Sequence, residues 1–187
     1  NKLEKNASSV KLTGEARLRY EDTTFSPDAL RGDNSTSLKL RTRLGVSGNI
    51  NDDWTYAGRF ENVQNLRGAG SEGTTTFDIA TVRGHIAGID TTIGRQEYMS
   101  NYGLLLDSSL DGAKFSFGNV LKTNVYYGRN TNEGNLGTTK ADVLGVDFKY
   151  ATSKVTNVVA AAFEVKNNEM SSNNKLNAYE IGVDTKL

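Results

Sequence analysis

Apolar and polar residues alternate along most of the chain with a period of two. This period is typical of a β-strand that separates an apolar from a polar medium. In the first such segment the apolar positions are Val10, Leu12, Gly14, Ala16, Leu18 and Tyr20, and the polar positions are Lys11, Thr13, Glu15, Arg17, Arg19 and Glu21. Similar segments follow at 38–47, 54–61, 76–87, 91–96, 112–117, 123–127, 144–150, 159–165 and 177–186. We therefore predict an all-β protein with about ten strands.

The connections between these segments alternate between long and short. Long ones are expected at 22–36, 65–75, 97–109, 130–140 and 166–175, and short ones lie between them. Strands of about ten residues can cross a bilayer at a tilt. Membrane β-barrels have short periplasmic turns and long outer loops. The pattern predicts an antiparallel up-and-down transmembrane β-barrel in an outer membrane, with a periplasmic N-terminus because the first connection is long.

Composition excludes several other classes of protein. The 187 residues include no Cys and one His, so a disulfide scaffold and a transition-metal site are not expected, and no cofactor is expected. Lys+Arg and Asp+Glu are equal at 22 each, which argues against a nucleic-acid partner. Only 36% of residues are hydrophobic. This value is compatible with a membrane barrel, since half of its strand residues are polar.

The polar faces of the first strands are rich in basic residues. We predict that they form one wall of a water-filled lumen. A sheet with one apolar and one charged face must bury its apolar side or turn it to lipid, and the absence of helical patterns favours lipid. The predicted wall consists of Arg17, Arg19, Lys39, Arg41, Arg43, Arg59, Arg83 and Arg95, although the phase of 91–96 is ambiguous.

The apolar faces are predicted to contact lipid. In the segment 159–165 this face is assigned to Val159, Ala161, Phe163 and Val165. Aromatic residues gather near the strand ends, where two girdles at the membrane interfaces are expected. The alternative is that aromatic side chains simply favour strands. The girdle residues are Tyr20, Trp54, Tyr56, Tyr127, Phe148 and Tyr150.

Two stretches resemble a known family. Ile93-Gly94-Arg95-Gln96, with Tyr102-Gly103 and Leu110-Asp111-Gly112, resembles the constriction-loop region of Gram-negative outer-membrane porins. The segment from Val10 to Tyr20 resembles the first barrel strand of porins that carry an S-layer-homology, peptidoglycan-binding domain upstream. The resemblance implies that the third long connection, 97–109, folds inward as a constriction. Glu97, Asp107 and Asp111 would then face the basic wall and set up a transverse field for polar solutes.

The resemblance also implies a domain organisation and an assembly for the complete protein. Residues 1–9 would be a periplasmic lead-in, and 10–187 would be barrel. Porins of this kind have about sixteen strands around an aqueous channel and assemble as homotrimers in outer-membrane lipid. The chain ends in Thr185-Lys186-Leu187 instead of an aromatic residue, so it is expected to be part of a larger barrel. Peptidoglycan would be bound through a missing upstream domain.

The expected function is passive diffusion of small hydrophilic solutes and ions, without catalysis. One alternative is a barrel adhesin or enzyme, in which His85 would be a candidate base, but the sequence shows no partner for it. The other alternative is a soluble β-sandwich or ligand-binding barrel. Detergent-free solubility would favour that alternative.

Overall fold

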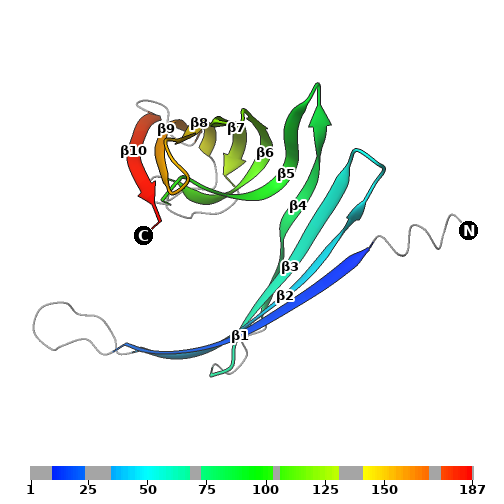
Figure 1. The fold of residues 1–187 in the computed structure, drawn as a ribbon. Helices are drawn as coiled ribbons and strands as arrows, with labels where there is room; N and C mark the ends of the chain where they lie inside the picture. Colours follow the sequence, from blue (N-terminus) through cyan, green and yellow to red (C-terminus); the bar gives the residue numbers. More distant parts are fainter. Residues whose placement is uncertain are drawn as a thin grey trace, which may run out of the picture. The chain divides into compact units, whose positions relative to one another are not determined.

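The chain is built from antiparallel β-strands (Figure 1). The computed structural model describes residues 10–23, 35–67, 73–102, 106–130, 141–168 and 174–186. The strands are β1 (Lys11–Thr23), β2 (Ser35–Asn49), β3 (Thr55–Asn65), β4 (Thr74–Ile86), β5 (Ile89–Met99), β6 (Asp107–Phe117), β7 (Leu121–Asn130), β8 (Ala141–Ala151), β9 (Thr156–Asn167) and β10 (Lys175–Thr185).

All ten strands belong to one sheet, in which the strands are neighbours in chain order. This order is an up-and-down meander, which confirms the predicted all-β antiparallel fold. Each predicted segment coincides with a strand, and most observed strands are longer than predicted. Among the described residues, no helix is long and apolar enough to cross a membrane. The lead-in 1–9 lies outside the described residues.

Contacts divide the chain into two compact units. The first contains residues 1–48 and 57–78, and the second contains 49–56 and 79–187. In the first unit, β1 pairs with β2 from Lys11 opposite Ser47 to Thr23 opposite Ser35. The register places the two alternating patterns in phase, so the apolar residues of both strands share one face. That face is open to its surroundings, since Leu12 is 69% exposed and Leu18 is 63% exposed.

In the second unit, β5 to β10 curl around a buried cluster (Figure 1). The Tyr98 hydroxyl on β5 donates a hydrogen bond to Asp147 on β8, although these strands are not neighbours. The concave face of the curled strands is therefore filled by side chains. The cluster consists of Tyr98, Leu106, Leu110, Tyr126, Val143, Ala161 and Phe163.

Gly145 of β8, which has no side chain, leaves room for the centre of this cluster. The Tyr126 ring lies over Gly145, where an added Cβ would come within 2.5 Å of the ring atom Cε2. The ring centroids of Tyr126 and Tyr98 are 3.8 Å apart, and Phe163 lies 5.8 Å away on the other side. Three aromatic rings from β5, β7 and β9 thus meet above a glycine.

The lipid-facing assignment of β9 is wrong. The register pairs Ala161 with Asp147 and Phe163 with Gly145, so Val159, Ala161, Phe163 and Val165 lie on the concave face. Ala160, Ala162 and Glu164 lie on the convex face instead. The physical reason is that both faces of β9 carry apolar residues, because the concave face is itself packed. Alternation alone could not decide which face is outward.

The β4–β5 hairpin contains backbone conformations with positive φ, both in its turn and within β5. Ala87 and Gly88 form the two-residue connection between β4 and β5, with φ of 50° and 78°. Positive φ at both positions is typical of a type I′ hairpin turn. Gly94, in the middle of β5, has φ of 113° and lies against the Ala80 carbonyl of β4. A side chain at Gly94 would be excluded both by backbone conformation and by space.

Candidate pore wall

The charged residues of β1 and β2 form one continuous polar face. Glu15 lies opposite Arg43, Arg17 opposite Arg41, and Arg19 opposite Lys39. The structure thus brings five of the predicted wall residues together on neighbouring strands. Like charges directly opposite one another destabilise a sheet, so this arrangement needs compensating acidic groups.

Acidic side chains lie between the basic ones. Glu15 sits beside both Arg41 and Arg43, and Glu61 of β3 reaches the Arg43 guanidinium. Because Glu15 is solvent-exposed, water screens its ion pairs. Basic and acidic side chains therefore alternate on this face, which makes its charge more balanced than the predicted basic wall. The ion pairs are Arg41–Glu15 at 2.5 Å, Arg43–Glu61 at 2.6 Å, Arg19–Glu21 at 2.6 Å, and Arg59–Asp78.

A polar hollow of about 190 Å³ opens within this network. Its walls include Thr13, Glu15, Arg43 and Arg59. Gly45 keeps it open, because a Cβ at that position would lie 2.5 Å from the Thr13 hydroxyl oxygen. The hollow is large enough for several water molecules, at about 30 Å³ each. The face can therefore hold water and small ions beside fixed charges of both signs.

Asp78 is paired with the predicted wall residue Arg59, although the sequence pattern did not point to it. It accepts hydrogen bonds from the Arg59 guanidinium, and both side chains are mostly buried. The rings of Phe77 and Phe60 stack with centroids 4.6 Å apart on the other face of β3 and β4. Phe77 precedes Asp78 and Phe60 follows Arg59, so pairing the two phenylalanines in the sequence would also have paired Asp78 with Arg59.

His85 has a partner that the sequence did not reveal. Its Nε2 lies 2.6 Å from the Asp90 carboxylate, across the short turn between β4 and β5. A hollow of about 520 Å³ beside this pair is also lined by Arg83, Asp52 and Asp53. Both members of the pair are well exposed, at 65% and 71%. The arrangement places Arg83 in a polar site at the short-turn end of the second unit.

Arg83 and Arg95, both assigned to the predicted wall, lie on opposite faces of the sheet. Arg95 lies opposite Ala80, Ile93 opposite Val82, and Thr92 opposite Arg83. Arg95 therefore shares a face with Ile93, while Arg83 points to the other face. The reason is that β5 continues from Ile89 to Met99 without interruption, so the strand alternation runs through Arg95.

The predicted acidic residues of the constriction lie on the same face as Arg95. Glu97, Asp107 and Asp111 lie in the paired strands β5 and β6, and the register places all three on the convex face with Arg95. Arg95 contacts Asp111 directly, with Nε 2.8 Å from a carboxylate oxygen. The two residues are cross-strand neighbours and do not face each other across a gap.

The connection between β5 and β6 is shorter than predicted and covers 100–106. Ser100 and Leu106 are each only 1% exposed, and the Ser100 amide donates to the Leu106 carbonyl at 2.7 Å. Tyr102 lies against Gly182 of β10. Residues 103–105, which include the predicted Gly103, lie outside the described part. The described ends of the connection thus pack against the concave face, which accounts for their apolar character.

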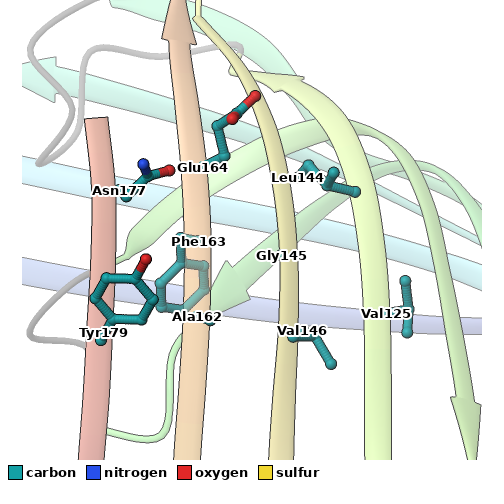
Figure 2. A pocket seen from close by; sticks show the side chains of 9 residues that line it. All are labelled: Val125, Leu144, Gly145, Val146, Ala162, Phe163, Glu164, Asn177 and Tyr179. Carbon is teal, nitrogen blue, oxygen red and sulfur yellow. The ribbon is translucent and has the colours of Figure 1, made fainter. Parts of the chain in front are cut away.

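The convex face of the second unit is largely apolar, and a row of charged residues crosses it. Leu144 and Val146 of β8 and Tyr179 of β10 are among the residues around an open hollow of about 370 Å³, and Figure 2 shows β9 between these two strands. Of the predicted girdle residues, Tyr127 and Tyr150 are exposed on this face, and Tyr20 is exposed in the first unit. Trp54 and Tyr56 are partly buried, as is Phe148. The row above the hollow, in register across β5 to β9, consists of Arg95, Asp111, Arg129, Asp142 and Lys166.

Comparison with known proteins gives limited similarity. No protein-family model matches the chain, and no curated protein matches it. Among solved structures, the chain is similar to OmpF of Salmonella typhi in a complex with daunomycin, with a TM-score of 0.45 and 14% sequence identity. The match covers 95% of this chain and 74% of that chain.

Proposed function

We propose that the chain forms part of the wall of an outer-membrane β-barrel pore, through which small hydrophilic solutes and ions diffuse passively without a catalytic step. The observation that carries this proposal is the two-faced sheet of β1 and β2. One face is a network of charges and the other exposes Leu12, Leu18 and Leu44. Soluble monomers rarely expose apolar patches of this kind.

The bilayer explains the exposed apolar residues of the second unit as well. Tyr179, Ile181 and Val183 on β10 are 75%, 82% and 62% exposed. Transfer of apolar surface from water to hydrocarbon gains about 25 cal/mol per Å². The lipid-facing side of the proposed barrel would therefore be this convex face together with the apolar face of β1 and β2. The exposed tyrosines would lie at the membrane interfaces.

The proposed water-lining wall is the charged face of β1 to β3. Basic residues outnumber acidic ones there, so the wall would favour anions over cations. The concave face of β5 to β10 is less suited to the passage of ions and solutes, because a cluster of side chains packs on it. We propose that the connection between β5 and β6, whose described ends Ser100 and Leu106 are buried, narrows the pore in place of the longer segment 97–109. A periplasmic N-terminus and a homotrimeric assembly belong to the same proposal, as does a closed barrel of more strands than the ten seen here.

Charge reversal in the wall tests the proposal. In planar bilayers, the double variant Arg41→Glu with Arg43→Glu should shift ion selectivity toward cations, because each substitution puts a negative charge in place of a positive one beside the proposed water path. Arg129→Glu, on the convex face, is the control and should leave selectivity unchanged. Unchanged selectivity in the double variant, or an equal shift in the control, would refute the proposed wall.

Solubility separates the pore from the remaining alternative. If the chain refolds without detergent to a monodisperse β-rich protein, a soluble β-sandwich or ligand-binding barrel is favoured and the membrane proposal fails. Incorporation into lipid vesicles with β-structure intact is the expected result. The same preparation supplies the protein for bilayer recording.

A further inference from the structure

Two acidic residues, Asp147 and Glu180, share the concave face of the second unit. In the register, Asp147 of β8 lies opposite Ala161 of β9, and Ala161 lies opposite Glu180 of β10. Only the methyl group of Ala161 stands between them on the concave face. Strands are about 4.8 Å apart, so the two backbones are about 10 Å apart, within reach of an Asp and a Glu side chain that converge.

The two carboxylates differ in their hydrogen-bond partners. Asp147, which is 7% exposed, accepts hydrogen bonds from the Tyr98 hydroxyl and from the Asn124 amide nitrogen at 2.7 Å. Both carboxylate oxygens of Glu180 are buried and have no hydrogen-bond partner among the described residues. Lys149 on the same face is engaged by Asp184 at 3.0 Å. A buried carboxylate without a partner is costly, so Glu180 needs a compensating group.

A third oxygen points into the same place. Tyr126 is only 2% exposed, and its buried hydroxyl has no hydrogen-bond partner in the described part, although the Tyr98 hydroxyl lies near it. The Tyr126 hydroxyl is within electrostatic reach of both Asp147 and Glu180. It reaches this position because its ring crosses β8 over Gly145.

These groups form a donor set made only of oxygen atoms, with up to two negative charges. Such a set suits a hard cation, and Ca²⁺ accepts six to eight oxygen ligands in flexible geometries. Among the described residues, no three His, Cys, Asp or Glu side chains are grouped for a metal ion. Hydroxyl groups and water would therefore complete the shell, which predicts weak binding, with a Kd of about 10⁻⁴–10⁻³ M.

We propose that Asp147, Glu180 and Tyr126 bind a Ca²⁺ ion on the concave face of β5 to β10. The ion neutralises the Glu180 carboxylate and engages the Tyr126 hydroxyl. It also links β10 to β7 and β8 across the intervening strands, so it stabilises the curl of the sheet. The site is independent of solute diffusion, and its test does not depend on whether the chain conducts.

Terbium luminescence tests the site directly. Tb³⁺ replaces Ca²⁺ at oxygen sites, and nearby tyrosine rings sensitise its emission. In the full chain refolded in a non-ionic detergent, tyrosine excitation should produce Tb³⁺ emission that added Ca²⁺ suppresses. Glu180→Gln and Asp147→Asn should each weaken Tb³⁺ binding at least about tenfold, which corresponds to about 1.4 kcal/mol.

The control is Asp184→Asn, which makes the same chemical change on the same face but in the pair with Lys149. This variant should bind Tb³⁺ like the parent chain. Equal binding in the parent and in Glu180→Gln, or equal losses in all three variants, would overturn the site. If Asp147→Asn fails to fold because the Tyr98 hydrogen bond weakens, Glu180→Gln decides the question. Ca²⁺ should also raise the urea midpoint of the parent chain and leave that of Glu180→Gln unchanged.

Discussion

Replacing Gly145 with alanine should destabilise the curled β5 to β10 by about 2 kcal/mol, the middle of the range for an overpacked core. The new Cβ would lie 2.5 Å from the Tyr126 atom Cε2, far inside van der Waals contact. β8 is paired on both sides, so its backbone cannot easily yield. The ring must move instead, and Tyr98 packs against it with centroids 3.8 Å apart.

A double-mutant cycle isolates this steric conflict. In a Tyr126→Ala background the ring is gone, and Gly145→Ala should then cost less than about 0.5 kcal/mol, leaving a coupling energy of about 1.5–2 kcal/mol. Urea unfolding of detergent-refolded protein, followed by far-UV circular dichroism, measures each variant.

The matched control for this cycle is another strand glycine. A Cβ added at Gly14 in β1 would meet only the Arg43 carbonyl oxygen, at 4.0 Å. Gly14→Ala should therefore change stability by no more than about 0.5 kcal/mol. The reasoning is refuted if Gly145→Ala costs the same with and without the Tyr126 ring, or if it costs no more than Gly14→Ala.

Two further substitutions probe the backbone by the same unfolding assay. Gly94→Ala should cost about 3 kcal/mol or more, because φ at this position is 113° and the methyl group would overlap the Ala80 carbonyl; a loss under about 1 kcal/mol would contradict the β4–β5 register. Ala87→Asn should raise stability by about 0.5–1 kcal/mol, since Asn tolerates the positive φ of 50° and Asn-Gly is the preferred type I′ pair; no gain would show that the turn has another conformation.

The strands could be predicted from the sequence because alternation is a local property. Each of the ten segments needed only its own residues. The end of β5 and the start of β6 were missed because Glu97 to Met99 and Asp107 to Asp111 show no alternation of apolar and polar residues. Their strand structure comes from pairing with each other, as in Glu97 opposite Ser109. Pairing of this kind depends on two segments together and leaves little trace in either one.

It was harder to predict which face of each strand lies on the concave side than to predict the strands themselves. Val159 and Phe163 were assigned to lipid because they are apolar, yet they lie on the face that holds Asp147. The curl of β5 to β10 gives that face a packed core and gives the convex face charges such as Arg95 and Asp111. Both faces carry apolar residues, and the curvature of the six strands decides which of the two is packed. No single strand carries that information.

Each pair of strands joined by a long connection contains its own cross-strand ion pair. Every hairpin therefore balances at least one of its charges before it meets a neighbour. In the proposed membrane barrel, a hairpin would therefore leave water at a lower electrostatic cost than a single strand, and the strands would enter the bilayer in pairs. The pairs are Arg41–Glu15, Arg59–Asp78, Arg95–Asp111, Arg129–Asp142 and Lys175–Glu164.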